Sequence, residues 1–220
     1  MQDYSSKGAS YFSEARSQIA PLLPAKIERV LEVGCGTGGT LAWLKSTGRA
    51  SYTVGIELFA PAADQARQVA DAAYCLDIER EPLPADLGRF DLVLCLDVLE
   101  HLIDPWGAVN LLVREQLGRG GTLLVSVPNV RHHSVLLPLL LHGQWEYQDR
   151  GLLDRTHLHF FTRSSALQLL THPLLSEPRC VPTGFEPGSR KRHFNRLTGG
   201  FFTEFLAFHY LLSATKLRDA

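Results

Sequence analysis

The segment that most constrains the fold is RVLEVGCGTGG at residues 29–39, where an apolar, strand-like run enters a glycine-rich turn. The glycines at 34, 36 and 38 allow the backbone to turn sharply and to approach a ligand closely, because they carry no Cβ. The helix expected after them begins with N–H groups that have no partner inside the helix. Glu32 adds a carboxylate at the end of the strand. A strand, a glycine turn and a helix in this order predict the ligand-binding first unit of an α/β protein.

Apolar, β-rich segments alternate with helical segments along the chain, which is typical of parallel strands joined by crossover helices. The pattern predicts strands over 29–34, 51–57, 72–76, 90–96 and 120–127, and helices over 9–20, 38–47, 60–70 and 105–117. A helix over 163–171, a strand over 179–184 and a β-rich run over 205–216 would complete the sheet. We therefore expect an α/β fold with a doubly wound, mostly parallel, seven-stranded, Rossmann-like sheet and a cover insertion after the fifth strand.

The length of 220 residues is enough for one ordinary α/β domain with a sizeable core, so we expect residues 1–220 to form a single domain. The regular alternation breaks down after Pro128, and residues 130–162 are expected to form an insertion on the substrate side of the pocket. Within it, the run VLLPLLL at 135–141 is too short to span a bilayer, and Pro138 interrupts it. We expect this run to be core or pocket wall.

Charge and cysteine content favour a protein that acts on small molecules in a reducing compartment. The 22 basic and 23 acidic residues nearly cancel, which gives no electrostatic reason to expect a nucleic-acid partner. The four cysteines form no C-x-x-C pair, which argues against structural zinc and against a disulfide framework. We expect neither a secretory signal nor a transmembrane segment. We therefore expect a cytoplasmic location, and the sequence carries no signal for an oligomeric state.

The glycine turn alone is compatible with two kinds of cofactor. Gly34, Gly36 and Gly39 also satisfy G-x-G-x-x-G, the pattern that binds dinucleotides after a strand. Glu57 closes the next apolar run and suits the ribose hydroxyls of either cofactor. A nicotinamide cofactor therefore stays open as an alternative on the basis of these residues.

Further motifs extend the pattern well beyond the glycines. Asp77 ends the third predicted strand in YCLDIE, and FDLVLCLDVLEHLIDP spans residues 90–105. Together with E-x-G-x-G-x-G, these segments resemble the motifs of class I S-adenosylmethionine (SAM) dependent methyltransferases. The P-N, D-R-T-H and F-F-T elements within 126–170 resemble a subgroup common among bacterial proteins that handle surface glycans and other small molecules, with MetW-type proteins related in outline.

The resemblance implies SAM as the cofactor, S-adenosylhomocysteine (SAH) as its product and a set of contacts at strand ends. It implies an N-terminal lid helix within residues 1–27, to which Tyr11 and Arg16 belong, and a contact between Tyr11 and the cofactor. Around the methionine portion it places Glu32, Gly34, Cys35, Gly36 and Gly38. Around the ribose and adenine it places Glu57, Leu58, Asp77 and Ile78, and on the far side of the cofactor it places Leu96 and Asp97.

Methyl transfer to an alcohol or phenol benefits from a base within hydrogen-bond reach of the acceptor. We predict His101, in DVLEH, and His157, in DRTHLHFFT, as alternatives for that base. Asp154 is expected to orient an imidazole or to contact the substrate. Nearby histidines, including His159, raise the question of a divalent cation, but no metal is predicted.

The sequence therefore predicts a SAM-dependent methyltransferase of the EC 2.1.1 class that acts on a small molecule. The expected acceptor is an oxygen of a sugar, a glycan precursor or another metabolite. Two alternatives stay open: a non-catalytic, MetW-like partner or regulatory subunit that binds SAM, and an NAD-dependent dehydrogenase. The dehydrogenase is disfavoured because the chain lacks a convincing hydride-handling residue set.

Overall fold

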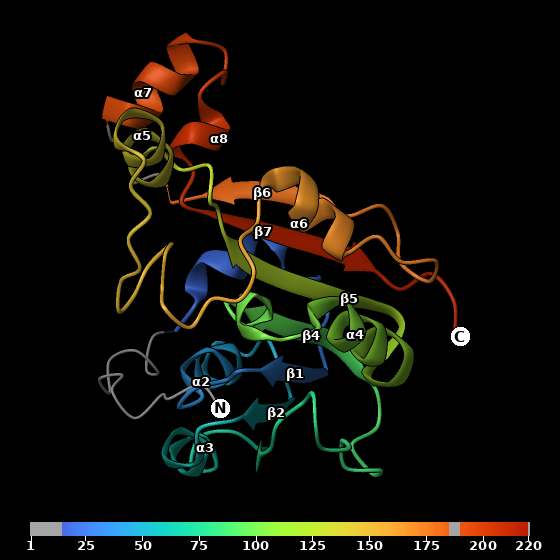
Figure 1. Cartoon of the computed structure of the whole chain (residues 1–220). Helices are drawn as coiled ribbons and strands as arrows, with labels where there is room; N and C mark the ends of the chain where they lie inside the picture. Colours follow the sequence, from blue (N-terminus) through green and yellow to red (C-terminus); the bar gives the residue numbers. More distant parts are fainter. Residues whose placement is uncertain (1–14, 185–189, 220) are drawn as a thin grey trace.

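In the computed structural model, residues 15–184 and 190–219 are described, and over these residues seven strands form one sheet in the order β3-β2-β1-β4-β5-β7-β6 (Figure 1). The strands are β1 (Arg29–Val33), β2 (Tyr52–Glu57), β3 (Ala72–Cys75), β4 (Phe90–Leu96), β5 (Leu117–Pro128), β6 (Arg179–Thr183) and β7 (His209–Thr215). Strands β1 to β5 pair in parallel, and β7 is antiparallel to both β5 and β6. The predicted seven-stranded, mostly parallel sheet is confirmed.

The strand order reverses at β1, which lies between β2 and β4. Glu32 of β1 is in register with Gly55 on one side and Leu94 on the other. Because the pairing is parallel, the carboxyl ends of β1, β2 and β4 meet at the same edge of the sheet. A crevice at such a reversal point is where open α/β sheets bind ligands.

Helical segments cover both faces of the sheet, as a doubly wound fold requires. They are η1 (Ser17–Leu22), α2 (Gly39–Ser46), α3 (Ala60–Ala66), η2 (Leu99–His101), α4 (Pro105–Leu111), η3 (Leu112–Gln116), α5 (His133–His142), α6 (Arg163–Leu169), α7 (Arg190–Leu197) and α8 (Thr203–Leu206). One apolar cluster contains Val109 of α4 and Leu169 of α6, and a separate cluster contains Ile19 of η1, Leu44 of α2 and Ala66 of α3. The two clusters lie on opposite faces of the sheet, because side chains alternate between faces along a strand.

Two predicted helices differ from the observed ones. Of the helix expected over 9–20, residues 9–14 lie outside the described part, and residues 17–20 belong to the 3₁₀ helix η1. Pro21 within it has no N–H to donate to an α-helical bond. The helix expected over 105–117 begins as α4 and continues as the π-helical segment η3. It stops there because Leu117 already pairs with Phe90 of β4.

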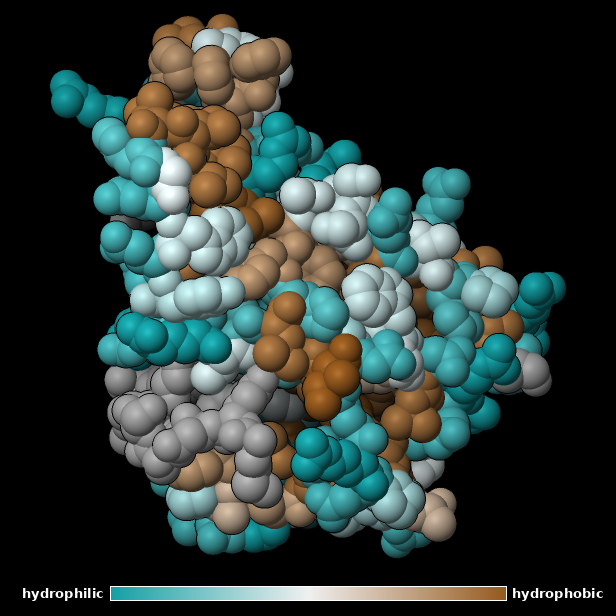
Figure 2. Space-filling model, in the orientation of Figure 1, coloured by the Kyte–Doolittle hydropathy of each residue, from teal (hydrophilic) through white to brown (hydrophobic). Residues whose placement is uncertain are grey.

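Apart from Val135, the apolar run at 135–141 is neither core nor pocket wall, which corrects the prediction for most of the run. It forms most of α5, where Val135 is buried but Leu140 and Leu141 are 74% and 70% exposed. Helices α5, α7 and α8 gather in a lobe beyond the sheet (Figure 1), and Figure 2 shows apolar surface over it. Only one side of α5 is buried, since Val135 packs on Leu152 and Leu153. Among the described helices, none is long and apolar enough to cross a membrane.

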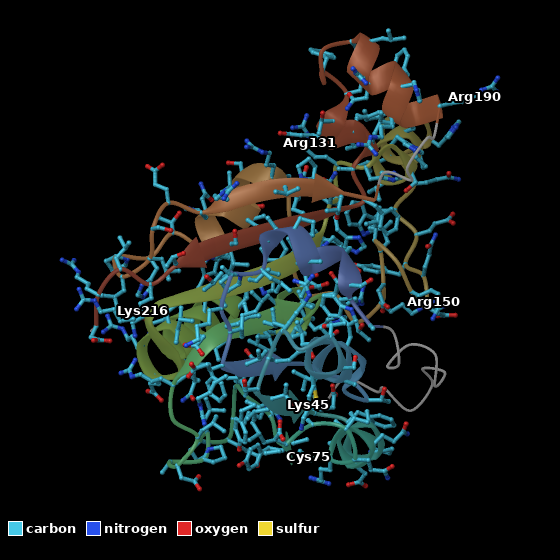
Figure 3. All side chains as sticks on the ribbon, turned by 180° about the vertical axis from the view of Figure 1, so that it is seen from behind. Lys45, Cys75, Arg131, Arg150, Arg190 and Lys216 are labelled. Carbon is cyan, nitrogen blue, oxygen red and sulfur yellow. The ribbon has the colours of Figure 1, made fainter. Side chains whose placement is uncertain are left out.

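The insertion at 130–162 therefore divides into two parts. Its first half carries α5 into the lobe, while its second half returns to the sheet edge and contributes Arg150, Asp154 and His157 to the main cavity. Figure 3 shows Arg150 on this returning segment, well away from Arg190 on the lobe. The part of the insertion that lines the cavity is thus short, and it is a loop.

Candidate active site

One large cavity opens at the carboxyl ends of β1, β2 and β4, with a volume of about 1230 Å³. Small-molecule sites commonly measure roughly 300–1,000 Å³, so this cavity has room for two small molecules side by side. Its wall is assembled from segments that are distant in the sequence, namely the glycine turn, the ends of β2 and β4, η2, the loop at 150–158 and the start of β7.

The glycine turn is clamped to the end of β2. The N–H groups of Gly34 and Cys35 donate to the Ile56 carbonyl at 2.8 and 3.1 Å, and the N–H of Gly36 donates to Glu57 Oε2 at 2.8 Å. Gly34 has φ +67°, and a Cβ at this position would lie 2.2 Å from Cγ2 of Val98. Glycine is therefore required at this turn for both backbone conformation and space.

Gly38 does not belong to the cavity wall, although the sequence placed it beside the cofactor. It precedes the first residue of α2 with φ +82°, and an added Cβ would lie 2.7 Å from Cγ2 of Val69. Its role is to start α2 and to let that helix pack closely on the segment after α3. Tyr11 lies outside the described residues.

Glu32 presents a buried carboxylate to the cavity. It is 3% exposed, and its Oε2 atom has no hydrogen-bond partner among the described residues. Burial raises the pKa of Glu32 to about 8, although a hydrogen bond from Thr40 and the nearby Arg16 guanidinium act in the opposite direction. An unpartnered, buried carboxylate at a cavity wall suits a cationic group of a ligand, because a cation would restore its ionised form.

Glu57 organises the turn as well as lining the cavity. Its Oε2 accepts from the Gly36 N–H at 2.8 Å, and its Oε1 accepts from the Phe59 N–H at 2.9 Å. Burial raises the pKa of Glu57, and these N–H donors oppose the shift. Since each carboxylate oxygen has a second lone pair, Glu57 can still accept from a ligand hydroxyl.

The other predicted cofactor contacts also line the cavity: Cys35, Leu58, Asp77, Ile78, Leu96 and Asp97. Asp77 Oδ1 accepts from the Glu79 N–H at 3.0 Å, which holds the turn after β3 in place. Burial raises the pKa of the Cys35 thiol, so this cysteine is not activated as a nucleophile.

Asp97 is the centre of an ionic network after β4. It is the only residue other than glycine with positive φ in the described part of the chain, at +56°. Its Oδ2 lies 2.8 Å from Arg16 Nη1, and its Oδ1 accepts from Ser126 Oγ at 2.6 Å and lies 3.7 Å from His209 Nε2. Burial acts to raise the pKa of Asp97, but His209, Arg16 and Ser126 together lower it.

Sequence analysis identified one member of that network, Arg16, and missed another, His209. Arg16 was singled out only through the family resemblance, and its N–H also donates to Thr40 Oγ1 at 3.2 Å. His209 was missed, because it arrives from β7, whose antiparallel pairing with β5 carries no local motif. The contacts with Arg16 and His209 hold the strained, positive-φ backbone of Asp97 in place, and such strain is common at functional sites.

A second group of titratable side chains lies in the same cavity wall and consists of Glu100, His101 and His157. Glu100 is fully buried, and neither carboxylate oxygen has a hydrogen-bond partner among the described residues. His157 Nε2 lies 4.0 Å from Glu100 Oε1, and the rings of His101 and His157 meet edge to face with centroids 4.8 Å apart. The predicted histidines are thus side by side, and sequence analysis missed Glu100 although it lies within DVLEH.

Backbone carbonyls hold both imidazoles. His101 Nδ1 lies 3.1 Å from the Thr156 carbonyl, and His157 Nδ1 lies 3.3 Å from the Leu152 carbonyl. A carbonyl only accepts, so Nδ1 carries the proton in both rings and Nε2 carries the lone pair when the ring is neutral. Burial, together with His157, lowers the pKa of His101 to about 4, while burial and Asp97 raise the pKa of Glu100 well above its ordinary value.

The loop that carries His157 is fixed to η2. The N–H groups of Leu158 and His159 donate to the Glu100 carbonyl at 2.8 and 3.0 Å. Asp154 Oδ1 accepts from the N–H and hydroxyl of Thr156 at 3.0 and 2.8 Å, so this buried carboxylate shapes the turn before His157. Asp154 also lines the cavity, and the Leu152 carbonyl lies at His157 Nδ1.

Comparison with known protein families identifies the family of this chain. The model of a family described as "Methyltransferase domain" matches residues 4–172. The chain belongs to this family. The identification of a class I SAM-dependent methyltransferase from the sequence motifs is therefore confirmed, and SAM is the cofactor that it carries.

Curated relatives of this methyltransferase match over part of the chain. A ubiquinone biosynthesis O-methyltransferase from Alkalilimnicola ehrlichii is 37% identical over 117 residues, or 51% of this chain and 46% of that protein. A tRNA U34 carboxymethyltransferase from Pseudomonas savastanoi is 33% identical over 129 residues, or 56% of this chain and 40% of that protein. The chain thus spans about half the length of these relatives, which differ in substrate.

Solved structures support the fold of the methyltransferase family. A SAM-dependent methyltransferase from Archaeoglobus fulgidus superposes with a TM-score of 0.64 at 16% identity and covers 97% of this chain and 100% of that one. A counterpart from Mesorhizobium loti has a TM-score of 0.61 at 17% identity, covering 96% and 99%. At these identities the likeness extends to the fold alone.

Proposed function

We propose that this protein is an enzyme that transfers the methyl group of SAM to an oxygen of a small-molecule acceptor, such as a sugar, a glycan precursor or another metabolite. The observation that carries this proposal is that the glycine turn with Glu32 and the group Glu100, His101 and His157 line the same cavity. A site of this kind brings a cofactor and an acceptor together in one enclosure. The O-methyltransferase named among the relatives supports an oxygen acceptor.

The cofactor half of the cavity fits SAM. SAM supplies a methyl group on a positively charged sulfur and becomes SAH when that methyl group leaves. The unpartnered, buried Oε2 of Glu32 suits the ammonium of the methionine portion. Gly34 leaves no room for a side chain at the turn, and we assign the ribose hydroxyls to Glu57. We assign the adenine to Asp77, whose carboxylate would accept from the exocyclic amine.

The acceptor half places basic nitrogens beside a carboxyl group. His101, with a pKa of about 4, is a weak proton acceptor near neutral pH. Of the two predicted bases, we therefore assign proton acceptance to His157, with Glu100 at 4.0 Å available to stabilise the imidazolium. Asp154 acts by shaping the turn that carries His157. Alignment of the two reactants in one cavity then supplies much of the rate enhancement.

We extend the proposal to the organisation of the chain. It comprises a single domain over 1–220, a lid within 1–27 and a substrate-side insertion at 130–162, with the protein located in the cytoplasm and no nucleic-acid partner. The tRNA-modifying relatives make nucleic acid the substrate class that an experiment must exclude.

Labelled SAM tests the proposed function directly. We expect label to move from SAM to hydroxyl-bearing compounds in a fractionated pool of bacterial metabolites, and not to purified bulk tRNA. Transfer to tRNA alone would contradict the acceptor class. Binding of SAH without transfer to any pool would favour the alternative of a non-catalytic partner or regulatory subunit.

A further inference from the structure

The carboxyl group of Glu100 is the least explained polar group in the cavity wall. It is fully buried, and neither of its oxygens has a hydrogen-bond partner among the described residues. Burial of an ionised carboxylate without partners is strongly unfavourable. A buried group of this kind in a native protein indicates a catalytic role or a bound ion.

We propose that Glu100, His101 and His157 together bind one divalent transition-metal cation. One carboxylate oxygen of Glu100 and one ring nitrogen of each histidine all lie within 4.8 Å of one another. Metal–ligand bonds to nitrogen and oxygen are about 2.0–2.2 Å long, so ligand atoms around one cation are roughly 3–4 Å apart. Closing this cluster onto a cation requires movements of about 1 Å or less. The sequence predicted no metal, and this proposal departs from that expectation.

The contacts around the cluster match those of metal-binding histidines. Each imidazole has Nδ1 on a backbone carbonyl, Thr156 for His101 and Leu152 for His157. Such a hydrogen bond fixes the ring and leaves Nε2 as the coordinating atom, which is the usual arrangement in metalloproteins. The carbonyl of Glu100 in turn accepts from the loop after His157, so η2 and the loop are held together.

The ligand types select among cations. Two imidazoles and one carboxylate suit Zn²⁺, Co²⁺, Mn²⁺ or Fe²⁺, whereas Mg²⁺ and Ca²⁺ prefer oxygen ligands throughout. Three protein ligands leave coordination positions open, which is typical of catalytic rather than structural sites. The cluster lines the cavity, so an open position faces the space of a second ligand.

The consequence for catalysis rests on the proposed function, whereas cation binding does not. An acceptor hydroxyl oxygen bound at the open position would become more acidic and lose its proton to water. A lone pair of that oxygen would form the new C–O bond to the methyl carbon, while the C–S bond breaks and its electron pair stays on sulfur. In that case His157 would be a metal ligand, and the cation, in place of His157 as a base, would activate the acceptor hydroxyl.

Cobalt is the probe that tests the site without reference to activity. The full chain, freed of any affinity tag and treated with a chelator, is titrated with CoCl₂ and followed by its visible d–d absorption. We expect a saturable signal with one equivalent of Co²⁺. Glu100→Gln and His157→Gln should each weaken binding at least tenfold. His159→Ala is the matched control on the same loop, and Cys75→Ser removes an exposed thiol that could bind cobalt; both should bind as the wild type does.

The outcomes separate the metal site from the proposed function. Absence of the d–d signal, or equal cobalt binding by the wild type and by His157→Gln, would overturn the site. A thermal shift on SAH addition checks that each variant is folded, and His157→Gln preserves the test if Glu100→Gln fails this check. Cobalt binding without methyl transfer would retain the site and reject the proposed function. If chelation leaves methyl transfer unchanged and no cobalt signal appears, the metal site is rejected and the proposed function is retained.

Discussion

Glu32 links cofactor affinity to pH in a way that can be worked out from the cavity. In the protein without ligand its pKa is raised to about 8 by burial, with Thr40 and Arg16 opposing. The ammonium of the bound cofactor favours the ionised carboxylate, so binding at pH 7 must expel a proton. Each unit of pKa corresponds to about 1.4 kcal/mol, which is the cost of ionising Glu32 at pH 7 before binding.

The sign and size of the effect follow from linkage. Only the ionised form binds well, so affinity rises with pH until the pH passes the pKa of the free protein. For a pKa of 8, the ionised fraction increases about ninefold between pH 6 and pH 7, and binding at pH 7 releases about 0.9 proton. The window below pH 7.5 keeps the ammonium of the ligand largely protonated, since α-amino groups titrate near 7.7–8.0.

Calorimetric titration with SAH measures both quantities. Affinity is determined at pH 6, 6.5, 7 and 7.5, and proton release is obtained at pH 7 from buffers that differ in ionisation enthalpy. Glu32→Gln should weaken binding and abolish most of the pH dependence. Glu28→Gln, an exposed acid outside the cavity, should behave as the wild type. An unchanged slope in Glu32→Gln, or wild-type binding without proton release, would refute the assignment of this carboxylate to the ammonium.

Three further predictions address the turn, the base and the ionic network. Gly34→Ala should reduce SAH affinity more than tenfold while the far-ultraviolet circular dichroism stays that of an α/β protein, because φ of +67° costs about 1–2 kcal/mol with a side chain and the Cβ would meet Val98 at 2.2 Å; normal affinity would contradict the turn geometry. His157→Ala should lower methyl transfer at least tenfold with SAH affinity unchanged, and equal loss of both would make this histidine structural. Asp97→Asn should lower SAH affinity several-fold, because asparagine tolerates the positive φ but loses the charge that lies 2.8 Å from Arg16. Faster limited proteolysis near Arg16 than in the wild type would check that this contact is lost.

The cofactor half of the cavity was accessible to sequence analysis because its parts are local. Glu32 and the glycines lie within one strand and one turn. A backbone position that needs a positive φ or has no room for a Cβ requires glycine, and that glycine is visible in the sequence. Glu57 ends β2 and Asp77 follows the end of β3, and parallel pairing brings such ends to one edge of a sheet. The same local logic was incomplete for Gly38, whose conformation serves the start of α2 and not the cavity.

The fate of the run at 135–141 depended on tertiary context. Its apolar residues predict burial by composition, but a helix buries only the side that another element covers. Leu152 and Leu153 cover Val135, whereas Leu140 and Leu141 face outward on the lobe. Which side is covered is set by the path of the returning loop, which no periodicity in α5 encodes.

Local patterns in the chain are enough to predict the order of strands and helices, the glycine turn and the acids at strand ends, since each depends on neighbours within a few residues. Only the tertiary structure placed His157 at 4.0 Å from Glu100 and His209 at 3.7 Å from Asp97. Those pairs join segments more than fifty residues apart, through a loop and an antiparallel strand. Burial in the assembled wall also sets the protonation of Glu100 and His101, because desolvation exists only once the surrounding chain has closed over them.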